Sequence, residues 1–343
     1  MQKHQKAANE ILSVIKTFTL SIDSSNDYRG NMSPLIHATS SMPLVNLGYW
    51  ERLIRSELDN NLHSTTQSNW KHWLQPVPKL TWLDIVNANG YKREKSLRAL
   101  SKYGAPNAFA LALAVRRLND WVPQVRTAAR EVLPSLLNNT ESEYVVEVLC
   151  MLLINWHSWG KMEETDKHIF LDMVISEEMA LLIKSRLISS TSGPMPSLLS
   201  QIGRTGILDN HLNEIANDAV QPYVRAKAYR SLFESRMTWV KGQEWQWIDK
   251  AYGKRKLIPI ISERKIDAQP PFLELLNRAA TDRSPTVRQV SAEFLIRNIE
   301  KLGLQSRIFA EKFAADKSAN VAEQGKFILR KLDEKALDNN INN

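Results

Sequence analysis

The sequence predicts an all-α solenoid, in which pairs of helices stack along one shared core. A short unit recurs in the 343 residues, with an Asp followed six or seven residues later by an Arg in a Val-Arg context. Each copy opens a segment whose apolar residues have helical spacing, and repetition at a fixed period is typical of stacked helix pairs. The clearest copies are the segments 120–126, 218–225 and 282–288.

The spacing of the arginines gives the length of the repeat. Arg93 aligns with Arg126, 33 residues later, while the next steps, to Arg225 and then to Arg288, are 99 and 63 residues. These gaps are close to one, three and two units of ~33 residues, within the range of known helical repeats. A degraded copy over 316–325 has Ala where the others have Arg, as expected of a terminal repeat with nothing stacked on its outer side.

The residue types in each copy fit a turn followed by a helix. The Asp can accept a backbone N–H and cap the helix, and a proline in the first turn loses no hydrogen bond because that N–H has no partner within the helix. The prolines are Pro123, Pro222 and Pro285. Apolar residues then follow at i, i+3, i+4 and i+7, which predicts one buried face. In the three copies this stripe consists of Val125, Ala128, Ala129, Val132 and Leu133; Val224, Ala228 and Leu232; and Val287, Ala292 and Leu295.

The pattern Asp-x-x-Pro-x-Val-Arg-x-x-Ala resembles that of HEAT-like repeats (HEAT/PBS-lyase type), in which Asp and Arg of successive units form a ladder along the solenoid. The resemblance covers roughly residues 84–137, 205–236 and 272–332, is weak over 138–204 and does not extend to 1–80. It implies that the ladder residues belong to the scaffold and not to a site. These residues are Asp120, Arg126, Asp218, Arg225, Asp282 and Arg288.

The repeats define the expected domain organisation. Residues 1–80 are predicted to form an irregular N-terminal region of helix and loop, and 81–336 the HEAT-like solenoid. An insertion interrupts the solenoid at about 238–268, and an irregular stretch at 189–196 precedes the third clear unit. The Asn-rich end, 337–343, is expected to fray.

Within the N-terminal region, the sequence predicts a different secondary structure for each of three segments. Residues 1–22 are predicted to be helical, because Ile11, Ile15, Phe18 and Ile22 fall on one helix face. The stretch 23–46, rich in Ser, Asn and Pro, is predicted to be a long loop, and 47–80 a short helix followed by a Trp-rich turn.

Composition indicates a globular chain without a membrane span. The chain is 43% hydrophobic and 24% charged, values typical of soluble domains. No apolar run approaches the ~18 to 20 residues of a span, and the stretch 7–22, interrupted by Glu10 and Lys16, is not a signal peptide. The single cysteine, Cys150, excludes an internal disulfide and has apolar neighbours, so we expect a buried, inert thiol and a cytoplasmic location.

Sequence motifs for catalysis are absent. The chain has no G-x-G-x-x-G, G-x-x-x-x-G-K, H-E-x-x-H or G-x-S-x-G motif and no paired C-x-x-C. His157, Asp166 and His168 lie near one another, but they lack a one-face helical spacing and a strong third ligand. We therefore predict no catalytic residue, no metal and no cofactor.

Charge is distributed unevenly along the chain. Residues 221–265 hold eleven Lys or Arg against four Asp or Glu, whereas 141–180 hold two against nine. The basic segment also interleaves aromatic residues with cations, a mixture that suits contact with phosphates and stacking on flat groups. The candidate binding residues are Trp245, Trp247, Lys250, Lys254, Arg255, Lys256, Arg225 and Arg230. If the insertion is functional, Lys250, Lys254, Arg255 and Lys256 should be exposed on one face, with Trp245 or Trp247 accessible beside them.

Three interpretations of the basic segment remain open: a plain structural insertion, a surface for an acidic protein partner, and a nucleic-acid surface. The leading hypothesis is a non-catalytic module that binds a protein partner. The alternative is a nucleic-acid binding protein, including a HEAT-like glycosylase that excises alkylated bases. For that activity the aromatic and carboxylate groups would come from Trp245, Trp247 and Asp249, or from Trp156, Trp159 and Asp166.

Overall fold

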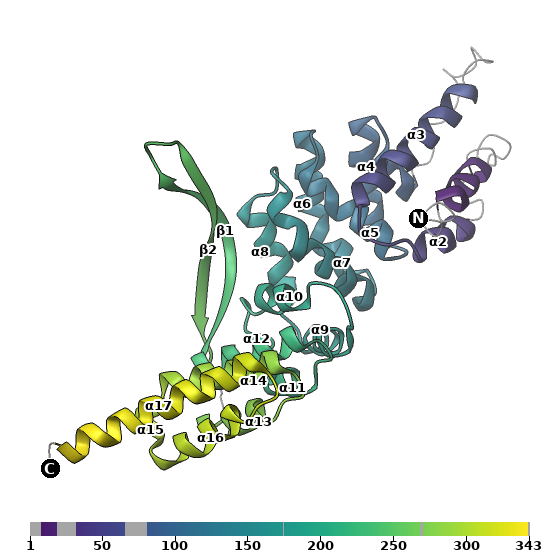
Figure 1. Ribbon diagram of the computed structural model, residues 1–343. Coiled ribbons are helices and arrows are strands. Elements are labelled where there is room, and N and C mark those ends of the chain that lie inside the picture. The colour runs from purple at the N-terminus through teal and green to yellow at the C-terminus, as the bar shows by residue number, and fades with distance from the viewer. Residues whose placement is uncertain (1–7, 19–31, 66–80, 174, 268–269, 342–343) are drawn as a thin grey trace. The chain divides into compact units, whose positions relative to one another are not determined.

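The chain is mostly helical in a computed structural model, which describes residues 8–18, 32–65, 81–173, 175–267 and 270–341 (Figure 1). Helices account for 69% of the residues and a two-stranded sheet is added to them, so the all-α prediction is confirmed in its coarse form. The chain forms two compact units, Met1–Val174 and Ile175–Asn343. We call them unit 1 and unit 2.

Unit 1 is built around a helix that is buried on every side. All eight residues of α5 (Ala108–Val115) are buried, because each is apolar and α5 packs against α2, α3, α6 and α7. The Asn107 side chain caps α5 by accepting the N–H of Ala110 and also donates to the carbonyl of Ile36 and the hydroxyl of Thr39 in α2. The elements of unit 1 are a helix over 8–18, α2 (Ser33–Ser40), α3 (Leu47–Thr65), η3 (Trp82–Val86), α4 (Gly90–Leu100), α5, η4 (Arg116–Asn119), α6 (Pro123–Asn138), α7 (Ser142–Asn155), η5 (Trp156–Ser158) and α8 (Glu164–Met173).

The N-terminal region differs from the sequence prediction. Helix α2 lies inside the stretch 23–46 that was expected to be a loop, and α3 is 19 residues long and not a short helix. The helix over 8–18 agrees with the helix expected over 1–22, as far as that segment is described. The rest of 1–22 and the predicted Trp-rich turn lie outside the described residues. Because α2 and α3 pack on α5, this region shares one compact unit with the helices up to α8.

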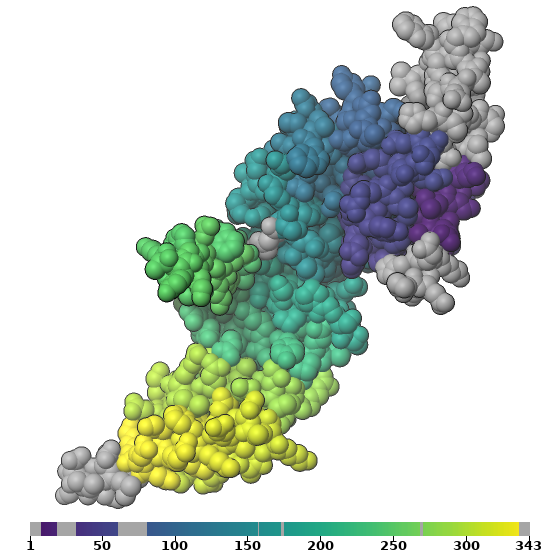
Figure 2. Space-filling view, turned by 45° about the horizontal axis from the view of Figure 1, so that its top comes forward, coloured from purple at the N-terminus to yellow at the C-terminus, as the bar shows by residue number. Residues whose placement is uncertain are grey.

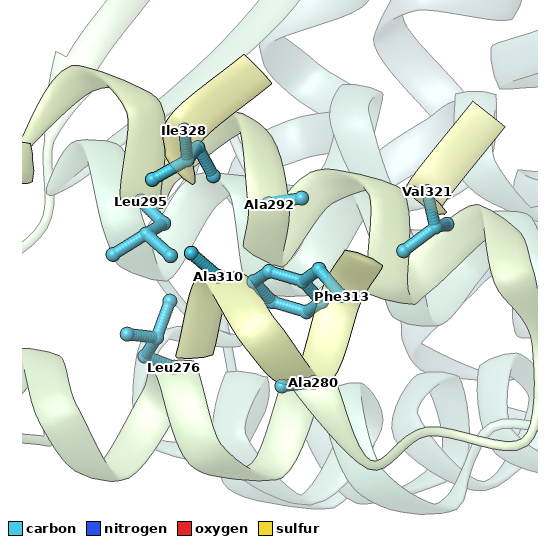
Figure 3. Close-up of a cluster of buried hydrophobic side chains, with 8 residues drawn as sticks. All are labelled: Leu276, Ala280, Ala292, Leu295, Ala310, Phe313, Val321 and Ile328. Atoms are coloured by element: carbon cyan, nitrogen blue, oxygen red, sulfur yellow. The ribbon is translucent and has the colours of Figure 1, made fainter. Parts of the chain in front are cut away.

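Unit 2 contains the hairpin and the C-terminal helices. Figure 3 shows eight buried side chains, contributed by four helices, that point toward one another around Phe313. Small residues allow these helices to approach closely: a Cβ on Gly325 would lie 2.2 Å from the backbone nitrogen of Ala314. The elements are α9 (Glu177–Ser189), α10 (Met195–Ile202), η6 (Asp209–His211), α11 (Leu212–Asp218), α12 (Pro222–Glu234), β1 (Arg236–Asp249), β2 (Lys254–Lys265), α13 (Phe272–Ala280), α14 (Pro285–Arg297), α15 (Ile299–Leu302), α16 (Leu304–Ala314) and α17 (Ala319–Ile341). Since α17 continues to Ile341, most of the tail expected to fray is helical.

The predicted apolar stripes are buried, as expected from their spacing. Every stripe residue of α6, α12 and α14 is less than 9% exposed, and each of these helices has its proline in the first turn. The periodicity of the sequence therefore identifies the core-facing side of these three helices correctly.

Each arginine of the recurring pattern hydrogen-bonds to the turn that precedes its own helix. Arg93, Arg126, Arg225 and Arg288 all donate from Nη1 to the carbonyl six residues earlier, at distances of 2.7–2.9 Å. That carbonyl has no partner within the helix, so the guanidinium satisfies it.

Three of these arginines also bind the carboxylate of the following turn. Arg93 pairs with Asp120, Arg225 with Asp282 and Arg288 with Asp316, each through Nε and Nη2. The Oδ1 atom of each Asp also accepts the N–H two residues further on, which fixes the turn. These contacts are the expected Asp–Arg ladder, and they extend it to Arg93 and Asp316.

Two of the six residues assigned to the ladder, Arg126 and Asp218, form no Asp–Arg pair within the described residues. Arg126 instead binds the backbone carbonyls of Asp120 and Trp121. Asp218 is exposed at the end of α11, and the ladder position in that turn is Ala219, whose carbonyl accepts Arg225. The step of 63 residues from Arg225 to Arg288, expected to hold two repeat units, contains the hairpin. Arg225 pairs across 57 residues with Asp282, against 27 for the first ladder pair, and the difference of 30 is the length of residues 236–265.

Candidate functional site: an exposed basic and apolar hairpin

The insertion forms a long antiparallel hairpin of β1 and β2, which stands out from the helices of unit 2 (Figures 1 and 2). Strands form here because the segment is rich in β-branched and aromatic residues, which favour extended backbone. At the tip, the Asp249 side chain accepts the N–H groups of Ala251 and Tyr252, and Gly253 takes a φ of +64°. A left-handed residue at this point favours glycine because it has no Cβ.

The base of the hairpin is fastened to α10 by packing. Met237 is fully buried, and its side chain occupies the space beside Gly203, where a Cβ would lie 2.4 Å from Met237 Cγ. Gln201 donates to the carbonyl of Val240 at 3.0 Å, and the Arg204 guanidinium lies 5.7 Å from the centre of the Trp239 ring. These contacts attach the first residues of β1 to a helix end.

Charged side chains also hold the base. Arg264 donates to the carbonyl of Gly203 at 2.6 Å and pairs with Asp209 at 2.7 Å. Lys227 of α12 reaches the hydroxyl of Thr238 at 2.8 Å, and burial lowers the pKa of this lysine. The base of the hairpin is therefore an integral part of unit 2.

The two faces of the hairpin carry different side chains. Trp245 pairs with Leu257 and Trp247 with Arg255, so these four side chains share one face. The other face carries Gln246 opposite Lys256, and Lys254 two residues before it. We call the first the Trp face, defined by Trp245, Trp247, Arg255, Leu257 and Ile261, and the second the lysine face, defined by Lys254, Lys256 and Ile260.

The prediction that the four cations share one face is wrong. Lys254, Arg255 and Lys256 are all exposed, but consecutive strand residues point to opposite faces, so Arg255 lies opposite both lysines. Lys250 belongs to the turn at the tip. The prediction of accessible indoles is correct: Trp245 is 63% exposed and Trp247 47%.

Two cations near the tip of the hairpin, Arg255 and Lys254, contact aromatic rings. The Arg255 guanidinium lies 4.9 Å from the centre of the Trp247 ring and 5.7 Å from that of Trp245. Lys254 lies 5.9 Å from the ring of Tyr252. Neither cation forms an ion pair within the described residues, so both retain donors for a partner.

Several exposed aliphatic residues of the hairpin were not singled out from the sequence. Ile248, Leu257, Ile260 and Ile261 are all exposed, along with Tyr252 at the tip. Monomeric proteins expose few contiguous apolar patches, and such patches commonly mark interaction sites. The available signal was the uninterrupted apolar run over 257–261, which lies between the charged residues of the basic segment.

Two arginines assigned to the site lie elsewhere. Arg225 is fully buried and bound to Asp282 and to backbone carbonyls, so it cannot reach a ligand, and its assignment to the binding surface is wrong. Arg230 binds Glu293 through both terminal nitrogens, at 3.0 and 2.6 Å. This hydrogen bonding, opposed by burial, lowers the pKa of Glu293. Arg230 is therefore engaged by the helices and is not part of the hairpin.

The second set of residues considered for base excision lies in the interior of unit 1. Trp156 and Trp159 are 1% and 7% exposed, so neither indole can stack on a ligand. Asp166 is buried and bound by Arg130 at 2.7 Å. In the first set, Asp249 holds the turn of the hairpin.

Metal clusters, membrane-spanning helices and similar proteins would also be indications of function. Within the described residues no group of three or more His, Cys, Asp and Glu side chains could hold a metal ion. Of the helices that the structure describes, none combines the length and the apolar character needed to cross a bilayer. No family model, curated protein or solved structure matches the chain.

Proposed function

We propose that this chain is a non-catalytic HEAT-like helical-repeat module that binds a protein partner through the Trp face of its hairpin. The single observation that carries the proposal is the exposure of large apolar side chains beside cations that have no carboxylate partner. Burying such side chains against a partner gains about 25 cal/mol per Å² of apolar surface. The free cations favour a partner with acidic groups near its apolar contact.

The Asp–Arg ladder supports the HEAT-like solenoid. The pairs Arg93–Asp120, Arg225–Asp282 and Arg288–Asp316 repeat the same two-point geometry at three turns. Equivalent contacts at successive turns are expected when similar helix pairs stack on one another. In such a scaffold the hairpin is an insertion that leaves the stacking intact and supplies a surface of its own.

Aliphatic exposure favours a protein over nucleic acid. Nucleic acids offer phosphates to cations and base faces to aromatic rings, and neither contact gives a role to Leu257 or Ile261. A protein partner can bury aliphatic and aromatic residues together around an arginine, as interface hot spots do. The open edges of a two-stranded ribbon can also accept a further strand from a partner.

Nucleic-acid binding is the second candidate, favoured by one observation. Arg255 lies over two exposed indoles, and both lysines of the lysine face are free of ion pairs in the described structure. This combination suits a single strand whose bases stack on Trp245 and Trp247 while the cations follow its backbone. Base excision would be a special case of this candidate.

The experiment compares the two faces. A partner is captured from the native host with the full chain as bait, identified by mass spectrometry, purified, and titrated against variants by calorimetry. The Trp-face variant is Trp245→Ala with Trp247→Ala, and the lysine-face variant is Lys254→Glu with Lys256→Glu. The control, Lys312→Glu with Lys326→Glu, reverses two exposed charges of unit 2 outside the hairpin.

Protein binding through the Trp face predicts a specific order of effects. The Trp-face variant should lose at least about tenfold in affinity, because hot-spot aromatics typically contribute more than ~2 kcal/mol each. The lysine-face variant should mainly slow association in a salt-dependent way. A partner that binds the Trp-face variant as tightly as the wild type would exclude the proposal. Tight binding of single-stranded DNA or RNA that weakens steeply with salt would support the second candidate instead.

A further inference from the structure

Unit 1 contains a pocket of about 400 Å³ whose eleven lining residues include five arginines. Residues of α3, the turn before α4, and η4 with the turn that follows it form its walls. Its size falls in the range typical of small-molecule sites. The arginines that line it are Arg52, Arg55, Arg93, Arg116 and Arg117.

Two of the arginines are fully used by the fold. Arg93 places Nε and Nη2 on Asp120 and Nη1 on two backbone carbonyls. Arg117 donates from Nε to the carbonyl of Leu113, from Nη1 to Asp120 at 2.8 Å and from Nη2 to Glu51 at 2.6 Å. Both side chains are almost completely buried, so they form the floor of the pocket.

The other three arginines that line the pocket retain hydrogen-bond donors. Arg116 uses only Nε, on Glu51 at 2.7 Å, which leaves both terminal nitrogens without a partner in the described residues. Arg55 binds the carbonyl of Val86 through Nε and Glu51 through Nη2, which leaves Nη1. Arg52 is exposed and has no ion pair in the described part of the chain. A planar guanidinium with free N–H groups is well suited to bind phosphate or carboxylate oxygens.

The pocket has an excess of positive charge. Its five arginines face two carboxylates, Glu51 and Asp120. Burial would raise the pKa of Glu51, but the charges and hydrogen bonds of Arg117 and Arg116 outweigh it and leave the pKa lowered. Burial would also raise the pKa of Asp120. The hydrogen bonds from Arg93 and from the N–H of Val122, together with the charge of Arg117, outweigh burial and leave this pKa lowered. Both acids are thus ionised at neutral pH, and the charge that they leave uncompensated attracts anions into the concave site.

An exposed indole stands at the rim of the pocket. Trp121 is 85% exposed, and its position is fixed by the ladder turn, where its carbonyl accepts Arg126 at 3.3 Å. The ammonium group of Lys161 lies 5.5 Å from the centre of the indole ring. A largely exposed indole beside a cationic pocket offers a flat surface on which a ring can stack.

We propose that this pocket binds a free nucleotide, with its phosphate on Arg52, Arg55 and Arg116 and its base on Trp121. Phosphate matches the free guanidinium donors, and the base matches the exposed indole of Trp121, which lines the same pocket. This site is independent of the hairpin, because every residue that forms it belongs to unit 1.

The test is calorimetric titration of the full chain at constant ionic strength with AMP, ribose 5-phosphate and adenosine. AMP should bind more tightly than ribose 5-phosphate, and adenosine should show no detectable binding. Arg52→Gln with Arg116→Gln should weaken the binding of AMP and of ribose 5-phosphate at least about tenfold, because it removes charge-assisted hydrogen bonds to the phosphate. Trp121→Ala should reduce the affinity for AMP to that for ribose 5-phosphate and leave the latter unchanged.

Lys102→Gln is the matched control, because Lys102 is an exposed cation of unit 1 that does not line the pocket. Arg52→Gln alone keeps the test valid if loss of Arg116 disturbs Glu51, since Arg52 is exposed and unpaired in the described structure. Absence of AMP binding at millimolar concentration overturns the proposal, as does equal binding by the double-arginine variant. If a single-stranded oligonucleotide displaces AMP with steep salt dependence and far higher affinity, the ligand is a strand and not a free nucleotide.

Discussion

Arg225 and Asp282 lie 57 residues apart in the chain and form a two-point ion pair, with Nε to Oδ2 and Nη2 to Oδ1 distances of 2.8 Å. The hairpin lies between them in sequence, yet the pair has the same geometry as Arg93 with Asp120, which has no insertion. The ladder therefore continues across the point where the hairpin leaves and rejoins the helices. This continuity explains how a long exposed ribbon can be added without loss of the packing between α12 and α14.

Replacing Asp282 by Asn should destabilise unit 2 by about 3–5 kcal/mol, because it leaves the buried guanidinium of Arg225 without its counterion. The side chains of Arg225 and Asp282 are only 1% and 8% exposed. Asp218→Asn is the matched control, since Asp218 is exposed in the same repeat and should change stability by less than about 0.5 kcal/mol. Denaturant unfolding followed by circular dichroism measures both, and equal effects of the two substitutions would contradict the ladder.

Replacing Ala129 by Asp should destabilise unit 1 by several kcal/mol, because it places an unpaired carboxylate in a position that is 1% exposed. Thr127→Asp introduces the same charge on the exposed side of α6 and should be nearly neutral. The comparison is made by denaturant unfolding at neutral pH. If Ala129→Asp left the midpoint unchanged, the buried face assigned to α6 would be incorrect.

The stripes could be predicted because they depend on local spacing, whereas the Asp–Arg contacts were expected from the resemblance to HEAT-like repeats. A helix with apolar residues at i, i+3, i+4 and i+7 has one buried face wherever it is placed, and a proline in the first turn marks where it begins. The prediction that Asp218 belongs to the ladder was wrong because the sequence pattern allows the Asp to lie either six or seven residues before the Arg. Only the structure shows that the carbonyl of Ala219 lies at the ladder position.

The sites depend on tertiary structure and were harder to predict. The composition of the hairpin indicated a basic aromatic surface, but bulges after Val240 and after Trp247 interrupt the alternation that would have identified strands. The arginine pocket gave no sequence signal, because Glu51 and Arg116 are 65 residues apart. Their convergence follows from the packing of α3 beside η4 and α5, which no local pattern encodes.

The pair of Arg288 and Asp316 should make stability depend on acid pH. The hydrogen bond from Arg288 lowers the pKa of Asp316, although burial opposes it, and the N–H of Ser318 lowers it further. A carboxyl whose pKa is lower in the folded state stabilises the fold fully above its unfolded pKa of about 3.9, and this stabilisation is lost as the pH falls through the folded pKa. The difference in unfolding free energy between wild type and Asp316→Asn should thus be constant from pH 7 to about 5 and shrink below about 4. Denaturant unfolding across this range measures it, and a difference that grew on acidification would contradict the assignment.

The contact between Gly203 and Met237 should control how the hairpin is attached. A Cβ on Gly203 would lie 2.4 Å from Cγ and 2.8 Å from Sδ of the fully buried Met237, so Gly203→Ala should cost about 1–3 kcal/mol through overpacking. Gly242→Ala is the matched control, because a Cβ there would meet only the end of Ile260, at 3.9 Å.

A double-mutant cycle separates this contact from a general effect of alanine at the end of α10. Met237→Ala removes the atoms that clash, so Gly203→Ala should destabilise the Met237→Ala background much less than it destabilises the wild type. The measurement is the free energy of unfolding of all four chains. If the two substitutions were additive, the cost would come from the backbone of the helix end, and the packing of Met237 on Gly203 would not be what fastens β1 to α10. A non-additive result would instead show that the contact of Met237 with Gly203 itself contributes to holding the base of the ribbon.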